Sequence, residues 1–304
     1  MSTVRLLQLA HLLISLQVRM TSARGVPIDI FNQDGSDMAL PHEDNFNALE
    51  GFTGIMYNAI PSTSNSKWRL QAGNDYIIPY TITGQYEPNE LEMLKKVMEH
   101  VHDTTCIRFK QRKDEKDYVE IQNNFKGGCY SPVGRHSGKR VMNLEANYAA
   151  TCFTPRILLH ELFHVIGLFH EHMRFDRDNY VTVHYDNVER RYWSQFQKLT
   201  LWQATTYNIP YDYKSIMHYS KTSFAKPGTI SMETKDPRYQ LSTAKAATPS
   251  DYLKVCKIYE CKRCLGDSTG NSDQDLDWLL TGSSLPSTSG AVFVIVIGMF
   301  HFWN

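Results

Sequence analysis

Residues 160–170 read HELFHVIGLFH and place three histidines, His160, His164 and His170, at the spacing of a catalytic zinc site. On a helix, His160 and His164 lie one turn apart, so both rings can reach the same Zn²⁺ ion from one face. Gly167 can adopt a positive φ and end the helix, which lets the chain turn back and bring His170 to the metal. Three histidine ligands leave one coordination position for water, as a catalytic zinc site requires.

Glu161 directly follows the first histidine. From this position its carboxylate reaches a metal-bound water rather than the metal, and this is where a general base for peptide hydrolysis must act. A short H-E-x-x-H pattern also arises by chance on ordinary helix surfaces, but the extension to Gly167 and His170 is much rarer. The pattern therefore indicates a metalloprotease with one catalytic Zn²⁺ ion.

A second segment, residues 215–219 with the sequence SIMHY, resembles the Met-turn that lies beneath the zinc site of metzincins. A lone methionine in a turn is more often core filler. Because the extended zinc motif is also present, we interpret Met217 as structural support for the metal site.

The residues around the zinc motif resemble the astacin family of zinc metalloendopeptidases. Residues 170–181 read HEHMRFDRDNYV, similar to the H-E-x-x-R-x-D-R-D-x-Y-V pattern of astacins. Similar segments occur upstream at 105–109, 117–121 and 128–135, and the resemblance covers residues 58–261. It implies an α+β metzincin catalytic domain of two lobes across a cleft. The upper lobe would hold a mixed twisted sheet and two long helices, and the lower lobe would be mostly irregular.

The resemblance also assigns roles by position. Tyr219 matches the astacin tyrosine that binds zinc in the resting enzyme and swings away to hydrogen-bond the transition-state oxyanion. A phenol can perform both tasks. Glu171 matches the glutamate that contacts the new N-terminus of the mature enzyme through a buried water network, although alone it would be a solvated surface acid. Arg177 and Asp178 are assigned to structure rather than to catalysis.

The six cysteines fit an oxidising compartment. The family resemblance implies two disulfides: Cys129 with Cys152, and Cys106 with Cys261. Cys256 and Cys264 have no counterpart in the simplest family pattern. They could pair with each other, pair between chains or compete with Cys261, and the sequence leaves these alternatives open.

Regular patterns place the scaffold around the site. Residues 88–102 carry four apolar residues at helical spacing after a proline, which predicts an amphipathic helix packed on a sheet; the four are Leu91, Leu94, Val97 and Val101. Residues 76–83, 118–122 and 141–144 are predicted to be short strands. By resemblance, the last of these is the exposed edge strand along which astacins bind extended substrate.

The N-terminal residues resemble processing segments. Arg5 precedes the apolar run 6–18, and small residues follow at 21–23, so residues 1–23 are predicted to be a secretory signal peptide, with an amphipathic helix as the alternative. Residues 24–57 are polar and turn-rich, and we expect them to form a short propeptide ahead of a protease domain at residues 58–264.

The C-terminal residues suggest tethering. Residues 265–290 are rich in Ser, Gly and Asp and are predicted to be a flexible stalk. The apolar run within 291–304 is shorter than a comfortable bilayer span but has the length of a GPI-attachment signal. Small residues suited to attachment stand upstream at 282–284, and an unstructured apolar tail is the alternative.

The predicted propeptide departs from the family in one respect. Astacin propeptides resemble F-x-G-D, whose aspartate caps the zinc, whereas the best match here is FTGI at residues 52–55, which ends at Ile55. An alignment on Glu50 and Gly51 places Phe52 at the same position instead. Neither side chain can ligate zinc, so we expect latency to rest on steric blockage and to be leaky. Tyr57 precedes the expected mature start, where relatives often carry arginine, which argues against a trypsin-like activator.

Composition limits the classes of function. The 32 basic and 32 acidic residues give a formal net charge of zero, so nothing marks a nucleic-acid binder. The sequence predicts a secreted or cell-surface zinc endopeptidase that acts on extracellular proteins or peptides, with membrane attachment through the tail as an option. One alternative is another metzincin, disfavoured because Glu171 and Tyr219 both fit astacins. The other is a noncatalytic, zinc-stabilised binding protein, which predicts loss of Glu161 or of a zinc ligand.

Overall fold

The computed structural model describes residues 25–32, 38–39, 57–199, 204–241 and 244–265. The predicted signal peptide (residues 1–23), Ile55 and the predicted C-terminal tail (residues 291–304) lie outside these residues. The described part of the predicted propeptide is residues 25–32, 38–39 and 57, and that of the predicted stalk is Leu265. In the part of the chain that is described, no helix is both long and apolar enough to cross a membrane.

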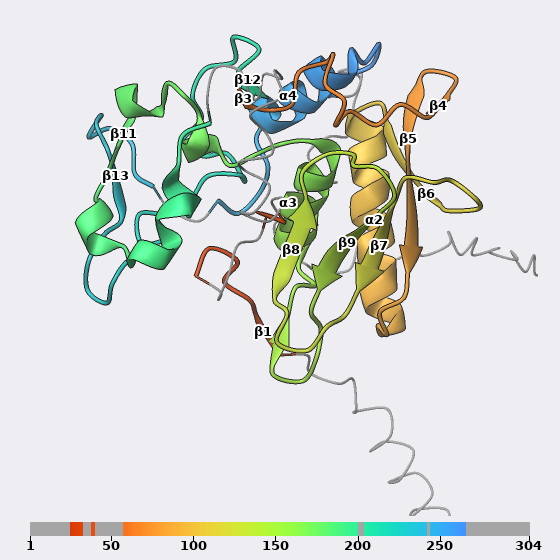
Figure 1. The fold of residues 1–304 in the computed structure, drawn as a ribbon, viewed down its shortest axis with the longest axis horizontal. Coiled ribbons are helices and arrows are strands. Elements are labelled where there is room, and N and C mark those ends of the chain that lie inside the picture. The colour runs from red at the N-terminus through yellow and green to blue at the C-terminus, as the bar shows by residue number, and fades with distance from the viewer. Residues whose placement is uncertain (1–24, 33–37, 40–56, 200–203, 242–243, 266–304) are drawn as a thin grey trace, which may run out of the picture.

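A seven-stranded mixed sheet forms the upper lobe (Figure 1). Its order is β2-β8-β9-β7-β5-β4, and β6 also pairs with β5. The strands are β2 (Met38–Ala39), β4 (Gln71–Ala72), β5 (Asp75–Ile82), β6 (Ile107–Gln111), β7 (Tyr118–Gln122), β8 (Cys129–Pro132) and β9 (Lys139–Leu144). Strand β5 runs parallel to β6 and β7, and β7 runs parallel to β9, whereas β8 is antiparallel to β9.

All three predicted strands are present, but one of them was wrongly placed at an exposed edge of the sheet. The strand predicted at 141–144 is β9, and it lies inside the sheet between β7 and β8 rather than at an exposed edge. The next strand outward is β8, whose free side pairs in parallel with β2 from the N-terminal segment. Alternation of side chains predicts a strand but not its partners, because pairing depends on residues far away in the sequence.

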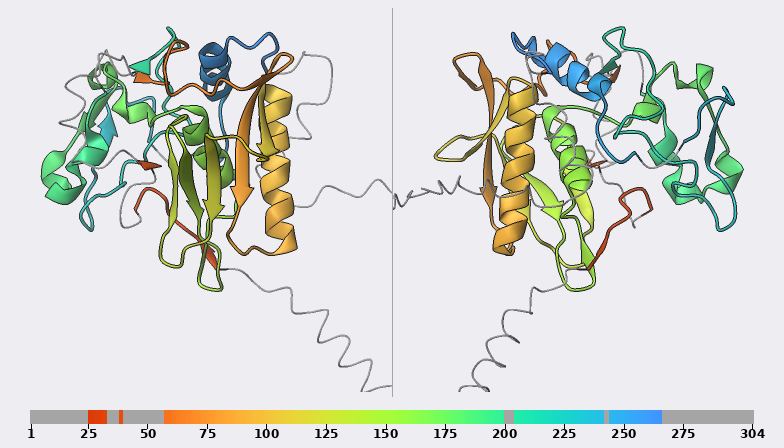
Figure 2. Two further views of the ribbon diagram at one scale, coloured as in Figure 1. Left: turned by 45° about the vertical axis from the view of Figure 1, so that its right-hand side comes forward. Right: turned by 180° about the vertical axis from the view of Figure 1, so that it is seen from behind.

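Two helices, α2 (Pro88–Thr104) and α3 (Pro155–Ile166), cover one face of the sheet (Figure 2). Helix α2 confirms the prediction for residues 88–102 and extends it by two residues. Three of the four predicted core positions, Leu94, Val97 and Val101, are buried. Leu91 was predicted to face the core but is 37% exposed, because Glu90, which is 2% exposed, takes the buried position in this turn of the helix.

The lower lobe is mostly irregular, as the family resemblance implied (Figure 1). It contains the strand pair β11 (Val181–Val183) and β13 (Met232–Thr234), and four short 3₁₀ helices at Glu171–Met173, Arg177–Asn179, Tyr185–Asn187 and Arg190–Phe196. Two short parallel pairs tie N-terminal residues to the domain: β1 (Val26–Pro27) with β10 (Ala150–Thr151), and β3 (Tyr57–Asn58) with β12 (Ala204–Thr205).

A third helix, α4 (Pro249–Tyr259), was not predicted. Thr248 is its N-cap, Pro249 occupies the first turn, and Asp251 completes a capping box. These residues form a helix-start signature that the sequence displays. The helix matters for the site because Tyr259 donates a 2.8 Å hydrogen bond to the carbonyl of Ile166, at the C-terminal end of α3.

The disulfides settle the open question of pairing. Both implied bridges are formed, and Cys256 pairs with Cys264, so Cys261 has no competitor. The bridge from Cys106 to Cys261 spans 155 residues and ties α4 to the strand region of the upper lobe. In the chain-entropy model a loop of this length stabilises the folded state by about 5 kcal/mol, which is an upper estimate.

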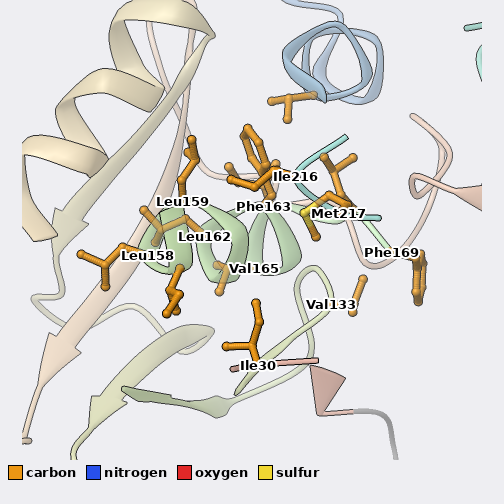
Figure 3. Packing of buried hydrophobic residues seen from close by; sticks show 14 of the residues in the cluster. Ile30, Val133, Leu158, Leu159, Leu162, Phe163, Val165, Phe169, Ile216 and Met217 are labelled. Atoms are coloured by element: carbon orange, nitrogen blue, oxygen red, sulfur yellow. The ribbon is translucent and has the colours of Figure 1, made fainter. Parts of the chain in front are cut away.

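The hydrophobic core runs along α3 (Figure 3). Leu158, Leu162 and Val165 on this helix are completely buried. Ile216 and Met217 lie beside the helix on one side, and Ile30 from the N-terminal segment lies on another. The helix that carries the zinc motif is therefore held from both lobes and also by residues of the predicted propeptide.

Candidate active site

Helix α3 begins where its sequence directs it to begin. The side chain of Thr154 caps the helix by accepting a hydrogen bond from the amide of Ile157 at 3.2 Å, and Pro155 takes the first helical position. His160 and His164 then fall one turn apart, and both side chains are completely buried. The predicted pair of ligands thus lies on one face of a helix inside the molecule.

Gly167 ends α3 with φ of 129°, in the region that L-residues rarely adopt. A Cβ atom at this position would lie 2.6 Å from Cδ1 of Ile60, so space as well as conformation requires glycine. The Gly167 amide donates to the carbonyls of Phe163 and His164, which closes the helix. The turn then delivers His170 to the other two histidines, as predicted.

His160, His164 and His170 form the one candidate metal-binding group of three or more ligands among the described residues. One nitrogen from each ring lies within 4.8 Å of the others, and all three side chains are buried. Nδ1 of His160 donates to the carbonyl of Ile216 at 2.9 Å, and Nδ1 of His164 donates to the carbonyl of Leu168 at 2.6 Å. These bonds place the ring proton on Nδ1 and leave Nε2 as the lone-pair nitrogen.

The two Nε2 atoms of His160 and His164 lie 3.1 Å apart. Since each bears a lone pair, this approach is unfavourable unless a cation or a proton lies between them. Three neutral imidazoles, with the far nitrogen of two of them bonded to carbonyls, are a donor set that suits Zn²⁺. The residues present therefore fit a catalytic zinc ion.

The Met-turn holds both ends of the zinc motif. The carbonyl of Ile216 accepts from His160, and the carbonyl of Met217 accepts the amide of Glu171 at 2.9 Å, directly after His170. Met217 itself is 1% exposed. Asp251 on α4 fixes the turn by accepting hydrogen bonds from the hydroxyl of Ser215 and the amide of Ile216. Met217 is thus buried in a turn that contacts both ends of the zinc motif, and its role as support for the metal remains a proposal.

Glu161 is completely buried beside the ligand histidines on α3. The hydroxyl of Ser131, on strand β8, makes a short hydrogen bond to Oε2 of Glu161. The same hydroxyl lies 2.9 Å from the backbone carbonyl of Glu161. Ser131 therefore orients the carboxylate from the sheet, and no local sequence pattern signals this contact because the two residues lie 30 positions apart.

Tyr219 lies next to the histidine cluster. Its ring centroid is 4.5 Å from that of His170 and 4.0 Å from that of His172, on which it stacks. Its hydroxyl donates to the side-chain oxygen of Gln195 at 3.2 Å. Nε2 of His172 donates to the backbone carbonyl of Gln195 at 2.9 Å. Gln195, which was not predicted, thus holds the hydroxyl of Tyr219 at the rim of the histidine cluster.

Glu171 is buried in an ionic network rather than solvated. Its carboxylate contacts Nζ of Lys254 through a short ion pair, Nη1 of Arg174 at 3.1 Å and the amide of Asp212 at 3.0 Å. In this structure the chain continues through Tyr57–Asn58, which pairs with Ala204–Thr205. The network joins α4 to the zinc motif, and the predicted contact with a new N-terminus remains a proposal.

The N-terminal segment 25–32 covers the histidines. It starts with the strand pair β1–β10, and it places Ile30 and Phe31 at 0% and 1% exposure. The ring of Phe31 lies 5.3 Å from the His160 ring and 5.9 Å from the His170 ring, centroid to centroid. The side chain of Asn32 anchors the segment on the lower lobe by accepting the amide of Phe224 at 2.8 Å. This segment thus lays an apolar ring against the candidate metal site.

Comparison with known proteins agrees with this geometry. The model of the Astacin peptidase family matches residues 62–260. Zinc metalloproteinase nas-5 of Caenorhabditis elegans is 46% identical over 215 residues, which cover 69% of this chain and 60% of that protein. Zinc metalloproteinase nas-6 of the same organism is 36% identical over 210 residues, or 68% of this chain and 58% of nas-6. The chain thus spans about three fifths of the length of these relatives.

A solved structure shares the fold. High choriolytic enzyme 1, a hatching enzyme zinc-protease from the medaka fish Oryzias latipes, aligns with a TM-score of 0.60 and 30% sequence identity. The alignment covers 66% of this chain and 97% of that structure. The family match spans well over half of the chain and includes the zinc motif, the Met-turn and the lobes that hold them. The chain therefore belongs to the astacin family.

Proposed function

We propose that this protein is a zinc endopeptidase that hydrolyses peptide bonds in extracellular proteins. The observation that carries the proposal is the convergence of three buried histidine nitrogens within 4.8 Å, with Glu161 directly beside them on the same helix. His160, His164 and His170 would hold the ion. When bound, zinc supplies the Lewis acidity that polarises the scissile carbonyl and lowers the pKa of a water molecule.

Three side chains of this protein would carry the proton transfers and the charge. Glu161 accepts the proton of the attacking water and passes it to the leaving amine, while Ser131 holds the carboxylate in place. Tyr219 would release Gln195 and donate its O–H to the negative charge that develops on the carbonyl oxygen. Burial of all these groups strengthens each interaction, because little water competes with them.

Neither of the two alternative functions accounts for the site as well as a zinc endopeptidase does. A noncatalytic zinc-stabilised binding protein would have no need of Glu161, yet this carboxylate is present, buried and oriented. Another metzincin family is disfavoured because the astacin model matches through the zinc motif and the Met-turn. Among substrates, hatching or egg-envelope proteins and matrix proteins are both open. The hatching role of the medaka enzyme is a property of that relative.

We also propose the processing steps that the sequence predicts. Residues 1–23 would be removed on secretion, and residues 24–57 would act as a propeptide. Residues 265–290 would form a stalk, and residues 291–304 a GPI-attachment signal that places the enzyme on the cell surface. The two disulfides that the family resemblance implied fit an oxidising compartment. Mass spectrometry of both termini of the protein made by secreting cells tests these boundaries, and an intact C-terminus at Asn304 would refute the anchor.

The function is tested by Glu161→Gln. The amide keeps the size of the side chain but cannot accept a proton, so peptidase activity should fall by about 10²- to 10⁴-fold. Bound zinc, measured by atomic emission, should stay at one ion per chain. Glu99→Gln is the matched control, because Glu99 is an exposed residue on α2 that pairs with Lys95. Comparable turnover in wild type and in zinc-replete Glu161→Gln would contradict the proposal.

A further inference from the structure

A polar cavity of about 740 Å³ lies at the end of the sheet where β5 and β7 finish. Its walls are residues 83–87, which follow β5, residues 122–124 at the end of β7, and Ala146. All of these residues lie outside the zinc motif and the Met-turn. The volume falls within the range of about 300–1,000 Å³ that small-molecule sites occupy. The cavity is therefore large enough to hold a ligand at a place separate from the histidine cluster.

The strand connections open a crevice at this place. Tyr80 of β5 lies opposite Gln111 of β6 and also opposite Val119 of β7, so β6 and β7 flank β5 on its two sides. After β5 the chain crosses through α2 to β6 (Figure 1), whereas after β7 it continues through β8 to β9, which pairs with the other side of β7. The two connections therefore diverge between the ends of β5 and β7. At the carboxyl ends of parallel strands, such a divergence is where ligands preferentially bind.

Hydrogen bonds fix the walls of the cavity. Nδ2 of Asn123 donates to the carbonyls of Gln85 and Ala146, at 2.9 and 3.0 Å, and Oδ1 of Asn123 accepts the amide of Ala146 at 2.9 Å. This side chain thus joins the loop after β5 to the segment after β9. The hydroxyl of Tyr86 donates to the carbonyl of Gln122 at 2.5 Å and ties the same loop to the end of β7. Because the walls are already ordered, little conformational entropy opposes binding.

Two side-chain amides supply the groups that a ligand can use. Gln85 and Asn124 are both exposed. Nδ2 of Asn124 donates to Oε1 of Gln122 at 2.9 Å, which orients the Asn124 amide. Within the described part of the chain, Oδ1 of Asn124 and the side-chain amide of Gln85 make no hydrogen bond. A primary amide carries N–H donors beside a carbonyl acceptor, and this pair matches two neighbouring hydroxyl groups of a sugar ring.

The charges around the cavity disfavour an anionic ligand. Its lining includes Glu87 but neither lysine nor arginine. Glu90 accepts the amide of Glu87 at 2.8 Å and completes a capping box at the start of α2. A carboxylate therefore already serves the helix N-terminus, where an anion would otherwise bind. The lining is mostly polar and offers little apolar wall for a peptide side chain. A neutral ligand rich in hydroxyl groups fits best.

We propose that this cavity binds a neutral oligosaccharide, with Gln85 and Asn124 as the residues that hydrogen-bond its hydroxyl groups. The inference goes beyond the proposed endopeptidase function and does not rest on it. A carbohydrate site here would let the protein bind glycosylated proteins through a surface that the histidine cluster does not use.

The test measures binding of four neutral trisaccharides, built from glucose, mannose, galactose or N-acetylglucosamine, to the protein as secreted by cells. Saturation-transfer difference NMR titrations give the dissociation constants, and at least one trisaccharide should bind. Gln85→Ala and Asn124→Ala should each raise its dissociation constant by about 3- to 10-fold, the effect of one hydrogen bond between neutral groups. The double variant should show no detectable binding.

Matched controls separate recognition from folding. Gln71→Ala and Asn74→Ala change exposed amides beside the start of β5, at the opposite end of the strand from the cavity, and should bind the trisaccharide as wild type does. Thermal unfolding verifies that every variant is folded. In ¹⁵N-labelled protein, the side-chain NH₂ signals of Gln85 and Asn124 should shift when the trisaccharide is added. Each signal is identified by its absence from the corresponding alanine variant.

Each other outcome overturns the proposal. Failure of all four trisaccharides to bind excludes a neutral carbohydrate site, and binding that persists in the double variant places the sugar elsewhere. Stronger binding of a sulfated heparin tetrasaccharide overturns the assignment to a neutral ligand. If acetylated, amidated tetraalanine shifts the signals of Gln85 and Asn124 in Glu161→Gln protein while no sugar does, the cavity binds peptide instead. These measurements do not involve turnover, so they stand even if the proposed endopeptidase function fails.

Discussion

Backbone carbonyls decide which nitrogen the zinc-motif histidines present. The carbonyl of Ile216 binds Nδ1 of His160, and the carbonyl of Leu168 binds Nδ1 of His164. Because these acceptors belong to the main chain, no side-chain substitution at 168 or 216 removes them directly. The metal site therefore depends on where the Met-turn and the end of α3 are held, and this explains why buried polar residues such as Asp251 fix the turn.

The contribution of Tyr219 to catalysis can be separated from that of the proton transfer by removing its hydroxyl group alone. In Tyr219→Phe the ring keeps its stacking on His172, but no hydroxyl is left to leave Gln195 and donate to the oxyanion. Loss of one such donor typically costs about 10²- to 10³-fold in kcat. We expect this decrease with little change in KM or zinc content. Tyr148→Phe, at a residue 81% exposed, is the control. Equal kcat in Tyr219→Phe and wild type would remove Tyr219 from the mechanism.

His218 should make stability depend on pH. Burial lowers its pKa from 6.5 to about 4, and its Nε2 accepts the hydroxyl of Tyr211. Between these pH values the unfolded chain binds a proton that the folded protein excludes, so the free energy of unfolding falls as pH decreases from 6.5 to about 4. The loss attributable to this group is on the order of 3 kcal/mol.

Urea unfolding of wild type and His218→Gln at pH 7 and pH 4.5 measures this loss. Glutamine can still bond to Tyr211 and to the backbone without titrating, so the free energy of unfolding should depend less on pH in the variant. All other residues are the same in both proteins, so the difference between the two pH dependences isolates His218. Identical pH dependences would show that His218 is not the responsible group.

At the scale of elements, the residue at which α3 ends matters for the site as much as the spacing of its histidines. Three donors from outside the helix bind its final carbonyls. Nε1 of Trp68 donates to Val165, the hydroxyl of Tyr259 donates to Ile166, and the amide of Gly134 donates to His164. These donors come from three distant parts of the chain. The stop after Ile166 is therefore set by tertiary structure as well as by Gly167, and it fixes the direction in which His170 leaves the helix.

Gly167→Ala tests this stop. Alanine at φ of 129° is strained, and its Cβ would lie 2.6 Å from Ile60. We expect a loss of about 2–4 kcal/mol in the free energy of unfolding, from backbone strain and overpacking together. His170 should also be displaced, so zinc affinity should fall. Adding Ile60→Val should recover only a small part of the stability, because it removes Cδ1 but keeps a γ carbon, and Cγ1 of Ile60 would lie 2.7 Å from the new Cβ. Unchanged zinc affinity in Gly167→Ala would contradict the role of the turn.

Local patterns in the sequence predicted α2, β5 and β7 closely, and the zinc motif identified all three histidines. What the sequence did not reveal depends on contacts between distant residues. Ser131 reaches Glu161 across 30 positions, and the hydrogen bond from Phe224 to Asn32 spans 192. Neither leaves a periodic signal. The misplaced edge strand has the same cause, because β9 and β8 differ in their neighbours and not in their local pattern.

Helix α4 was not predicted, although the sequence carries a start signal for it. The start of α4 carries Thr248, Pro249 and Asp251 in the order of a capped helix, but its apolar face is interrupted by Lys254. That lysine is 1% exposed because it pairs with Glu171. A buried ion pair breaks the hydrophobic pattern by which helices are recognised, so the start signal alone indicated this helix in the sequence.

At the scale of the whole molecule, the two lobes are joined at the zinc site and by the predicted propeptide. Segment 25–32 pairs with β10, buries Ile30 against the core of α3 and reaches the lower lobe at Phe224. Residues 38–39 form β2 and pair with β8, so a strand from the N-terminal region forms this edge of the sheet. In this form a substrate would have to compete with the protein's own segment 25–32 for the space beside the histidine rings.

The last prediction concerns this competition. Among the described residues, the group from the N-terminal segment that meets the histidine rings is the phenyl ring of Phe31, which cannot ligate a metal. If the Phe31 ring alone blocks the site, the blockage can open transiently, and the unprocessed protein should retain measurable activity. Phe31→Ala should raise this activity, because it removes a buried ring worth about 3–5 kcal/mol to the packing of the segment. Ile55→Asp, by offering a carboxylate to the zinc, should lower it.

The assay compares these variants as cleavage-resistant precursors with the mature enzyme, after mass spectrometry has verified that the N-terminus is intact. Phe125→Ala, at an exposed ring of the upper lobe, serves as the control and should leave precursor activity unchanged. A wild-type precursor that is completely silent, and stays silent in Phe31→Ala, would show that a group outside the described residues, such as Glu50 or Asp44, blocks the metal instead. If Phe31 causes the latency by blocking the site, the activity of the precursor should rise when the ring of Phe31 is removed.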